Sequence, residues 1–537
     1  MEPPPATGAR PAGRPGVPPD PYDQAVSTLT AAQHQAVAST APALCIIAGA
    51  GSGKTRVLTL RAARRIRDGS ADADHTVICT FTRKAATELR HRLTRYGVTV
   101  STPAPPGGAP GPGARTGTLH QLGLTLLRRH AFDAGQAPPS VAERRDETIR
   151  GLVGDPALAP AVAAEIGWAK ANRLTPGSYA DGVGRAGRPE LVPVGTVVKA
   201  FTSYEASLAR RKMLDLDDVL LRSADLLLDD ETFARHMHWR YRHLSVDEFQ
   251  DVNPAQFRLI MALLGTRQDL CAVGDPNQAI YGWNGADPGL IADLGDHVPG
   301  LEVVRLDENH RSTPQVVRAA AAALGPTGAV PPRSAAADGP LPVVTAYDDD
   351  EAEADGVVAV VSDRAAGGMR WSDQAVLART HDQLATVRRA LTRAGIPHRT
   401  APGPDGGPTG PTGAGPRRPP GDTDAVELAT FHRAKGLEWT SVMVVGLEDG
   451  FVPIVHAGAG PAREEERRLL YVALTRASTD LYCSWARVRT MGGGRRVERR
   501  PSPWLAGVAR VSRTGPLKPS PVDTGRRIAA IRAALRT

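Results

Sequence analysis

One segment restricts the fold of this chain more than any other: the run Ala-Gly-Ala-Gly-Ser-Gly-Lys-Thr at residues 48–55. It follows the apolar run Leu44–Ile47 and opens a helical pattern over Thr55–Ile66. A glycine-rich loop in this position cradles phosphate groups with its backbone N–H groups, helped by the positive end of the helix. Ala48 stands where the strict pattern has glycine. The context still predicts a nucleotide site in an α/β fold.

Side chains of this loop, and of one later segment, have the chemistry that a nucleotide requires. Lys54 can reach the β- and γ-phosphates, and Thr55 can coordinate Mg²⁺. Asp247 and Glu248 follow a second apolar run. A carboxylate that ends a strand suits an Mg²⁺ contact, and the next one can orient or deprotonate the attacking water. An Asp-Glu pair alone is usually a solvated turn, but together with the loop it predicts an ATPase that uses ATP and Mg²⁺.

Short apolar runs alternate with amphipathic helical patterns along most of the chain, which is typical of buried parallel strands. The further predicted strands are Val77–Cys79, Leu244–Val246, Leu270–Val273, Ala375–Leu377 and Val442–Val445, and further predicted helices are Lys84–Tyr96 and Asp382–Ala394. A chain of 537 residues is too long for one hydrophobic core. We therefore predict two doubly wound α/β domains, with a helical region inserted into the first.

Composition sets the expected domain boundaries. Residues 401–422 hold 14 Gly or Pro among 22 residues, which cannot bury a core. The predicted units are a disordered Pro/Gly-rich N-terminus (1–21), a first α/β domain (22–118 and 225–302), an inserted helical subdomain (119–224), a second α/β domain (303–400 and 423–510), a Pro/Gly-rich linker (401–422) and a basic C-terminal tail (511–537).

Charge, cysteines and hydropathy limit the class of protein. The net charge of +8, with arginines dense after Trp485, suits a polyanionic partner. Cys45, Cys79, Cys271 and Cys483 lie in or beside predicted strands without metal-ligand spacing, so we expect reduced buried thiols. No apolar run approaches the roughly 18 residues that span a membrane, and the N-terminus lacks a signal peptide. A cytoplasmic, nucleoid-associated enzyme without a membrane partner is expected.

Nine segments, in this order, resemble those of the UvrD/Rep-type DNA helicases of superfamily one. They are Gln33, AGAGSGKT (48–55), TFTRKAA (80–86), GTLH (117–120), VDEFQD (246–251), GDPNQAIYGW (274–283), NHRS (309–312), TFHRAKGLEW (430–439) and YVALTRA (471–477). The resemblance covers Leu29 to about Leu505. It implies two RecA-like domains that use ATP to move 3′ to 5′ along single-stranded DNA, in repair, recombination or replication restart. The implied partners are single-stranded DNA and single-strand/duplex junctions.

The resemblance also implies roles for residues of the nucleotide site. Those that bind the phosphates and Mg²⁺ are Ala48, Gly49, Ala50, Gly51, Ser52, Gly53, Lys54 and Thr55, with Asp247 as a further Mg²⁺ contact and Glu248 as the catalytic base. Those that sense or stabilise the γ-phosphate are Gln250, Gln278, and the arginine fingers Arg311 and Arg476. Those that hold the base and ribose are Gln33, Arg56, His310 (usually Tyr in the family) and Glu438.

The resemblance assigns DNA contacts as well. Phe81 and Trp283 are implied to stack on bases, with Thr82, His120 and His432 as further contacts; core packing is the alternative for Phe81, Trp283 and His120. Asn284 replaces a frequent arginine of the family. Fuller relatives carry an additional regulatory helical domain, called 2B, about where the 401–422 linker stands. The sequence therefore predicts a shortened form that lacks most or all of that domain.

Two other classes of function fit parts of the pattern. A P-loop regulator would use ATP to switch a binding state without moving, but every catalytic position is present here. An RNA-directed enzyme is the other alternative, although the segments do not resemble those of DEAD-box proteins. ATPase assays with single-stranded DNA, with RNA and without polymer separate the three.

Overall fold

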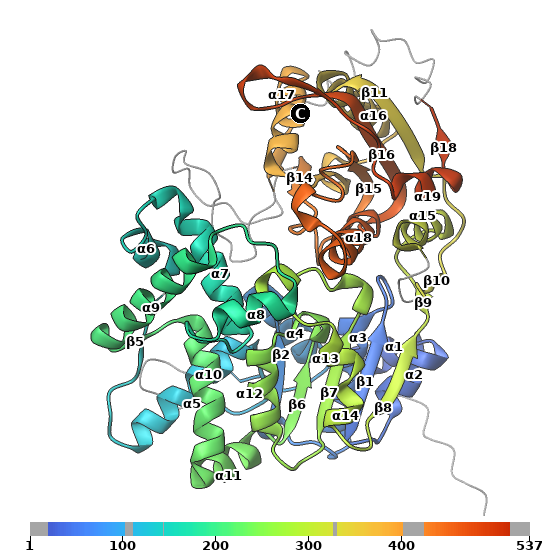
Figure 1. Ribbon diagram of the computed structural model, residues 1–537. Helices are drawn as coiled ribbons and strands as arrows, with labels where there is room; N and C mark the ends of the chain where they lie inside the picture. Colours follow the sequence, from blue (N-terminus) through green and yellow to red (C-terminus); the bar gives the residue numbers. More distant parts are fainter. Residues whose placement is uncertain (1–19, 102–110, 143, 326–329, 401–423, 516–537) are drawn as a thin grey trace, which may run out of the picture.

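The computed structural model describes residues 20–101, 111–142, 144–325, 330–400 and 424–515. Two α/β domains lie one above the other in Figure 1, and a small helical body stands beside the lower one. Three predicted segments fall outside the described residues wholly or in large part: residues 1–19 of the N-terminal region, the 401–422 linker, and residues 516–537 of the basic tail. The expected disorder of the N-terminal region does not extend to Pro21, which begins a helix.

The first domain is built on a six-stranded sheet whose paired strands all run parallel, with strand order β3-β2-β6-β7-β1-β8. Its strands are β1 (Ala43–Ala48), β2 (Thr76–Thr80), β3 (Arg115–Thr118), β6 (His243–Val246), β7 (Leu270–Gly274) and β8 (Glu302–Leu306). Non-consecutive neighbours require crossover connections, and helices supply them. The predicted doubly wound α/β class is confirmed.

Helices cover both faces of this sheet, so its strands are apolar on both sides. Leu44 and Ile46 of β1 face one core, while Ala43 and Cys45 face the other. The first core is covered by α1 (Pro21–Ser27), α2 (Ala31–Ala38), α3 (Lys54–Arg67) and α4 (Arg83–Arg95). The second is covered by α5 (Leu119–Asp133), α10 (Leu216–Asp229), α11 (Glu231–Arg240), α12 (Pro254–Leu264), α13 (Gly289–Ala292) and α14 (Leu294–His297).

The inserted subdomain has its own small core and is shorter than predicted. It comprises α6 (Arg145–Arg150), α7 (Ala159–Ala171), α8 (Tyr179–Ala186) and α9 (Val194–Arg211), with the short strands β4 (Ser140–Val141) and β5 (Met213–Leu214). The predicted limits of 119 and 224 are wrong because α5 and α10 pack into the core of the first domain. Helical periodicity identifies such helices, but it does not say which core receives their apolar face.

The second domain is built on a sheet of order β13-β14-β12-β15-β16-β11-β18, with β17 added antiparallel to β16. Its strands are β11 (Val343–Asp349), β12 (Gln374–Ala378), β13 (His398–Thr400), β14 (Val426–Thr430), β15 (Trp439–Val444), β16 (Ala477–Thr490), β17 (Arg496–Glu498) and β18 (Arg513–Thr514). One face is covered by α16 (Asp350–Ala366) and α17 (His381–Arg393). The other is covered by α15 (Pro314–Leu324), α18 (Pro461–Leu474) and α19 (Leu505–Arg510).

Two predicted boundaries of this domain need correction. The boundary at 302/303 cuts through β8, which pairs with β1 in the register Leu44↔Glu302 and so belongs to the first sheet. The tail predicted from residue 511 includes β18, which pairs with β11. A junction of β9 (Glu308–Asn309) and β10 (Arg333–Ser334) connects the two domains. An edge strand of two to five residues has too little pattern to assign to one sheet or the other from sequence.

The cysteines lie where the strand pattern places them. Cys45, Cys79, Cys271 and Cys483 are buried in β1, β2, β7 and β16, and they are free thiols. Burial raises the pKa of each thiol. Within the described ranges, every helix is too short or too polar to cross a membrane.

Candidate active site and nucleic-acid interface

The phosphate loop connects β1 to α3 at the carboxyl edge of the first sheet. Gly53 has φ 82° and Gly51 has φ 72°, a left-handed conformation that glycine adopts without strain. A Cβ on Gly51 would lie 2.6 Å from the Asn309 side chain, so the loop also has no room for a larger residue there. Lys54 begins α3, and its Nζ lies 3.9 Å from Asp275 Oδ2. The loop and its lysine therefore have the conformation that a phosphate site requires.

The predicted acidic pair ends β6 next to this loop. Thr55 Oγ1 lies 3.4 Å from Asp247 Oδ2, and Asp247 is buried. A hydroxyl and a carboxylate are oxygen ligands of the kind that Mg²⁺ takes together with phosphate and water, without an all-protein cage. No cluster of three or more His, Cys, Asp or Glu that could hold a metal occurs in the described part of the chain. These residues fit a metal ion that enters with the nucleotide.

Glu248 has the charge state that a catalytic base needs. Burial alone raises its pKa, but the positive charges of Lys54 and Lys435 lower the pKa of Glu248 to about 2. Burial, and then the charge of Glu248, raises the pKa of Asp247 to about 7. Gln250 Nε2 donates to Glu248 Oε2 at 2.6 Å, which fixes the orientation of the carboxylate.

The two predicted sensor glutamines are joined through one aspartate. Gln250 Oε1 accepts a hydrogen bond from the backbone N–H of Asp275 at 2.8 Å. Gln278 Nε2 donates to Asp275 Oδ2 at 2.5 Å. Asp275 also forms an ion pair with Lys54, so this one aspartate contacts Lys54, Gln250 and Gln278. Gln278 is in the 3-10 turn η4 (Pro276–Gln278) that leads toward the aromatic residues described below.

The two predicted arginine fingers lie near each other, one in the segment that connects the domains and one in the second domain. Arg311 Nε forms an ion pair with Glu438 Oε2 at 2.6 Å. Arg476 is buried, and its guanidinium donates to the backbone oxygens of Val472 and Leu437 and to Thr475 Oγ1. Among the described residues Arg476 has no carboxylate partner at ion-pair distance, and burial together with the charge of Arg311 lowers its pKa. A buried guanidinium without a counter-ion, such as that of Arg476, is stabilised by a nearby polyphosphate.

The residues predicted to hold the base and ribose make contacts within the protein. The Gln33 amide is used by the capping box of α2 and by the carbonyl of Ser52, to which Nε2 donates at 2.9 Å. Arg56 donates to the carbonyl of Ala25 at 2.7 Å and to Thr28. His310 Nε2 lies 3.8 Å from a Glu308 carboxylate oxygen, and its backbone N–H bonds to Gly51. Binding of an adenine by Gln33 and Arg56 therefore requires these contacts to open.

Asn309 is a site residue that received no role from the sequence, although it lies in the NHRS segment. Its Nδ2 donates to the carbonyl of Ala50 at 2.8 Å, and its Oδ1 accepts the backbone N–H groups of Arg311 and Ser312, each at 2.8 Å. Ser312 Oγ donates to the carbonyl of Ala477, the neighbour of Arg476. One buried amide thus connects the phosphate loop to the backbone beside both arginines.

An aromatic cluster is built from residues of both domains. The Phe81 and Tyr281 rings are stacked, with centroids 6.3 Å apart and an interplanar angle of 5°. Trp283 and His432 complete the cluster, each with its centroid within 6.5 Å of Tyr281. Trp283 is 49% exposed, which excludes core packing for this ring. Tyr281 was missed, although it lies two residues before Trp283 in the same segment.

The other predicted DNA contacts have different surroundings. Thr82 caps α4 through a hydrogen bond from Ala85. Burial, followed by the charges of Arg379 and Lys435, lowers the pKa of His432 to about 3, so its ring is neutral at physiological pH. Burial lowers the pKa of His120, and Asp217 and Asp215 partly offset this effect. His120 therefore lies near acidic residues that begin α10, and among the described residues its ring makes no aromatic contact with the cluster.

Lys435 of the second domain is a further residue that the sequence did not single out. Its Nζ forms an ion pair with Asp251 of the first domain and donates to the carbonyl of Gln278 at 2.8 Å. The same Nζ lies 4.9 Å from the centroid of the Tyr281 ring. Burial alone would lower the pKa of Lys435, but Asp251 and Glu248 raise it. Lys435 thus contacts both Gln278, the predicted sensor, and the aromatic cluster.

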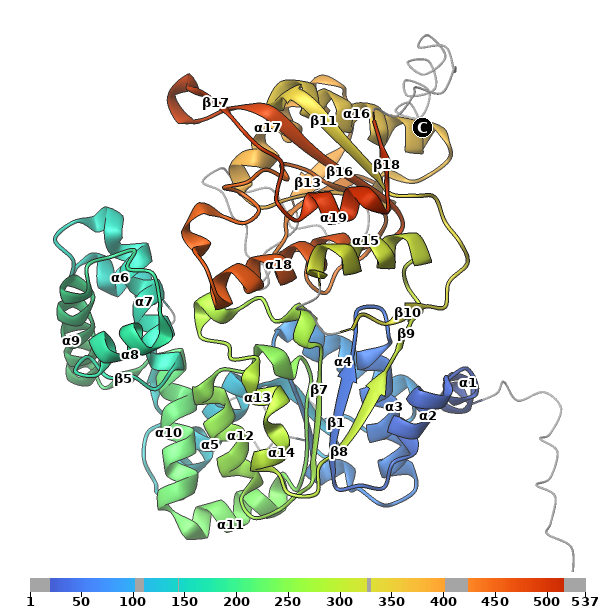
Figure 2. The same ribbon diagram turned by 45° about the vertical axis from the view of Figure 1, so that its right-hand side comes forward.

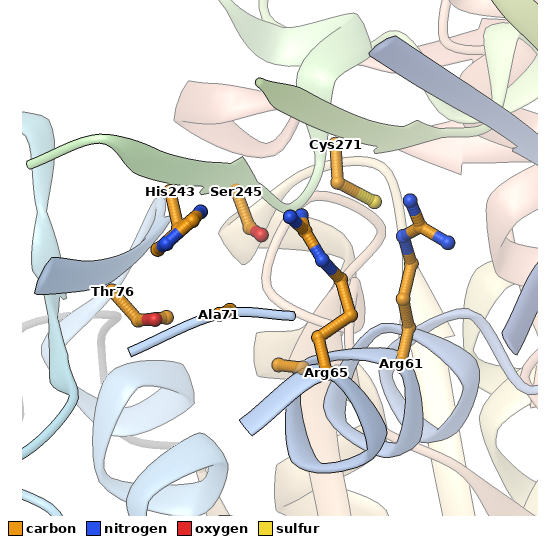
Figure 3. A pocket seen from close by; sticks show the side chains of 8 residues that line it. Arg61, Arg65, Ala71, Thr76, His243, Ser245 and Cys271 are labelled. Carbon is orange, nitrogen blue, oxygen red and sulfur yellow. The ribbon is translucent and has the colours of Figure 1, made fainter. Parts of the chain in front are cut away.

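A small cavity lies at the opposite, amino-terminal edge of the first sheet (Figure 3). Arg61 and Arg65 of α3 point into it toward Cys271, with His243, Ser245 and Thr76 on the other side. Its volume of about 10 Å³ has room for about one water molecule. Asp269 pairs with both Arg65 and His243, and Arg61 donates to carbonyl groups around the end of α2. These contacts stabilise this edge of the domain. The cavity is too small for a ligand larger than a water molecule.

Comparison with known proteins gives matches in both domains. A sequence profile described as the UvrD/REP helicase N-terminal domain matches residues 29–299. A second profile, described as the UvrD-like helicase C-terminal domain, matches residues 418–488. Together they include the phosphate loop, the acidic pair, the aromatic cluster and Arg476.

Individual relatives match over similar regions. ATP-dependent DNA helicase UvrD2 of Mycobacterium tuberculosis is 33% identical over 92% of this chain and 83% of its own length. ATP-dependent DNA helicase PcrA of Leuconostoc citreum is 30% identical over 68% of this chain and 49% of its own length. ATP-dependent DNA helicase Rep of Escherichia coli is 32% identical over 54% of this chain and 42% of its own length.

Proposed function

The chain belongs to the UvrD/Rep family of ATP-dependent DNA helicases, and we propose that it moves 3′ to 5′ along single-stranded DNA and opens duplexes at single-strand/duplex junctions. One observation carries the proposal: Lys54 of the first domain and Arg476 of the second both act on the charge of Glu248, and Arg311 lies near Arg476. An aromatic cluster that includes the exposed ring of Trp283 is built from both domains. Such an arrangement can connect hydrolysis to movement of one domain against the other. Repair, recombination or replication restart are the processes in which we expect it to act.

We propose that the phosphate loop, residues 48–55, holds ATP, and that Thr55 and Asp247 hold Mg²⁺, which supplies charge stabilisation at the phosphates. Lys54 binds the β- and γ-phosphates, and Glu248 accepts the proton of the attacking water. Gln33 and Arg56 then exchange their contacts within the protein for the adenine. His310 is proposed to stack on the adenine, and Glu438 exchanges its ion pair with Arg311 for a contact with the ribose. Freed from Glu438, Arg311 can turn its guanidinium toward the γ-phosphate.

The coupling of the two sites is proposed to run through Gln250, Gln278 and Lys435. The side chain of Gln278 donates to Asp275, which contacts Lys54, and the backbone carbonyl of Gln278 accepts a hydrogen bond from Lys435. Lys435 comes from the second domain, on the same loop as His432. A closing movement of the second domain therefore displaces the hydrolysis sensor and one edge of the aromatic cluster together.

Stacking energies support a helicase rather than a simple switch. Base–aromatic stacking contributes about 1–3 kcal/mol per base, and opening one base-pair step costs on the order of 1.4 kcal/mol. Phe81 and Trp283 together can therefore offset the opening of about one to four steps. Thr82, His120 and His432 are proposed as additional contacts. His432 has no positive charge to offer, so its contact is a stack or a neutral hydrogen bond.

Some of the arginines that follow Trp485 lie on a β-hairpin rather than in the predicted C-terminal tail. Strands β16 and β17 form an antiparallel pair that projects from the second domain (Figure 2). Arg487 and Arg496 are exposed and pair with Asp348 and Asp349, whereas Arg495 and Arg500 are exposed with no ion-pair partner among the described residues. We propose that this hairpin contacts DNA phosphates. Each phosphate neutralised on duplex DNA adds about 0.9 to the log–log salt slope.

We further propose that the chain works without the 2B domain of fuller relatives. Strands β13 and β14 are neighbours in the sheet, and only 25 residues separate Thr400 from Val426. Domains need about 50 residues or more, so this segment is too short for a separate domain. We expect motor activity on single strands to remain and the grip on duplex DNA to be weaker.

The decisive test of direction compares unwinding of 3′-tailed and 5′-tailed duplexes, alongside ATPase rates with single-stranded DNA, with RNA and without polymer. We expect unwinding of the 3′-tailed substrate and an ATPase rate that rises with single-stranded DNA. Equal ATPase rates under all three conditions contradict the translocase and favour a P-loop regulator. Stronger stimulation by RNA contradicts the DNA assignment, and unwinding only of the 5′-tailed substrate contradicts the polarity.

Replacing Trp283 by alanine should weaken activation by DNA and leave the basal ATPase rate almost unchanged. Loss of one stack costs about 1–3 kcal/mol, so the DNA concentration for half-maximal stimulation should rise at least about fivefold. Trp239→Ala is the matched control, because Trp239 is 60% exposed but lies outside the cluster. A DNA response equal to that of the wild type, with or without a loss of thermal stability, contradicts the stacking role.

A further inference from the structure

The loop that carries Trp283 is held by two neighbours outside its own domain core. Trp283 lies in the 3-10 turn η5 (Gly282–Asn284). From the second domain, the Glu465 carboxylate of α18 lies against the backbone N–H groups of Trp283 and Gly282. From the inserted subdomain, Arg188 Nη2 donates to the carbonyl oxygen of Trp283 at 3.2 Å. The peptide groups on both sides of the Trp283 Cα are therefore contacted, one by each neighbour.

Arg188 is itself held by two side chains of the inserted subdomain, Glu165 and Trp168. Its Nε and Nη2 bond to both carboxylate oxygens of Glu165 at 2.9–3.1 Å. Its guanidinium carbon lies 4.7 Å from the centroid of the Trp168 ring. Glu165 is 5% exposed, and Tyr179 Oη donates to it at 2.8 Å. The planar guanidinium is thus held by Trp168 on one face and by Glu165 along one edge. The Nη2 group, which donates to the Trp283 carbonyl, is therefore held in a fixed orientation.

A close backbone approach accompanies this hydrogen bond. Gly285, directly after the turn, has φ 92°, and a Cβ there would lie 2.7 Å from the Cβ of Ala171 and 3.1 Å from Asn172 Nδ2. Both of these residues end α7, the helix that also carries Glu165 and Trp168. The contact between the subdomain and the turn is therefore a fitted surface rather than one isolated bond.

We propose that Arg188 is a positioning residue for the Trp283 stacking platform, so that the inserted subdomain sets how the first domain grips single-stranded DNA. The inference rests on the proposed function, because it assumes that Trp283 stacks on a base. Arg188 does not touch DNA in this role. It acts by holding the carbonyl end of the turn, so that the exposed ring meets a base without first having to be ordered. Ordering a loop on binding costs affinity, and holding it beforehand removes that cost.

Lysine cannot replace arginine in this geometry. A guanidinium offers several N–H groups in one plane, so it binds Glu165 along one edge and still donates to Trp283. An ammonium on a shorter, flexible stem keeps the charge near Glu165 but loses this bidentate, directed arrangement. Arg188→Lys therefore separates the charge of Arg188, which it retains, from the directed hydrogen bond, which it loses.

The test compares Arg188→Lys and Arg188→Ala in the full chain with Arg185→Ala as the matched control. Arg185 is exposed on α8 and has no ion-pair partner in the part of the chain that the structure describes. The first readout is the single-stranded DNA concentration that half-maximally stimulates the ATPase. We expect it to rise about threefold to tenfold in both Arg188 variants, the range of one hydrogen bond, with the basal rate and the Arg185 variant unchanged.

A second readout does not depend on activity. The emission of Trp283 is obtained by subtracting the spectrum of the Trp283→Phe protein from that of the parent, with and without the Arg188 substitution. We expect acrylamide to quench this emission more strongly when Arg188 is replaced, because the turn is then less restrained. An equal rise for Arg185→Ala, or unchanged quenching and unchanged DNA response in Arg188→Lys and Arg188→Ala, overturns the inference. If single-stranded DNA does not stimulate even the wild type, the proposed function fails instead.

Discussion

Replacing Glu248 by glutamine is expected to stop ATP turnover while ATP still binds. The amide has the size of the carboxylate, but it cannot accept a proton from the attacking water. General base catalysis contributes about 10² to 10⁴ in rate, and we expect a loss of that order. Gln250 Nε2 donates to Glu248 in the native protein, and the side-chain oxygen of a glutamine at 248 can accept the same bond. Single-turnover hydrolysis and binding of a fluorescent ATP analogue measure the two effects separately.

Two further variants make the Glu248 result specific. Lys54→Ala should lose hydrolysis together with affinity for ATP, because no other side chain of the loop reaches the β- and γ-phosphates. Glu147→Gln is the matched control, since Glu147 is half exposed on the inserted subdomain. Turnover within threefold of the wild type in Glu248→Gln would remove this carboxylate from the reaction and leave Asp247 and Asp251 as the other acidic groups of the same segment.

The fold was largely predictable because the signals that define it are local. Runs such as Leu44–Ile47 and Val442–Val445 are apolar on both faces. This pattern is typical of strands that are covered on both sides of a sheet. The helix predicted over Thr55–Ile66 is observed as Lys54–Arg67, and the one over Asp382–Ala394 as His381–Arg393. Periodicity therefore determined the type and position of the elements to within a residue or two.

Domain membership was less predictable, because it depends on contacts between distant parts of the chain. Helices α5 and α10 are separated by the whole inserted subdomain, yet they pack side by side, with Gly123 leaving room for Ser223. Nothing near Leu119 or Leu216 in the sequence indicates that partner. The same holds for β8 and β18, which are short edge strands identified only by their pairing with β1 and β11.

The candidate site shows the same division between local and non-local information. Lys54, Asp247, Glu248 and the arginines lie in segments whose residue types indicate the chemistry. By contrast, Asn309, Lys435 and Arg188 donate hydrogen bonds to backbone carbonyl groups of other segments. A carbonyl group is present at every position, so no sequence pattern marks it as an acceptor. The residues that connect the parts of the site are therefore the ones that only the structure reveals.

Removing the Arg476 guanidinium is expected to have the largest effect of all on hydrolysis. An arginine finger contributes about 10³ to 10⁵ in rate, because its planar charge stabilises the negative charge that spreads over the γ-phosphoryl oxygens. Arg476 lies in the second domain and is near enough to Glu248 to help lower the pKa of that carboxyl. We expect Arg476→Ala to reduce the single-turnover rate by about a thousandfold or more, while affinity for single-stranded DNA stays within about twofold.

The burial of Arg476 makes the choice of control important. Its hydrogen bonds to Val472, Leu437 and Thr475 hold the end of α18, so alanine there also removes packing. Arg476→Lys keeps the positive charge and most of the volume but loses the fork of N–H groups. If the role of Arg476 is purely structural, Arg476→Lys should recover both the melting temperature and the hydrolysis rate that Arg476→Ala loses. If Arg476 is an arginine finger, Arg476→Lys should recover the melting temperature but not the hydrolysis rate, because an ammonium cannot bind two phosphoryl oxygens side by side. A loss below tenfold in a well-folded Arg476→Lys protein contradicts the finger and leaves Arg311, once released from Glu438, as the group that acts on the γ-phosphate.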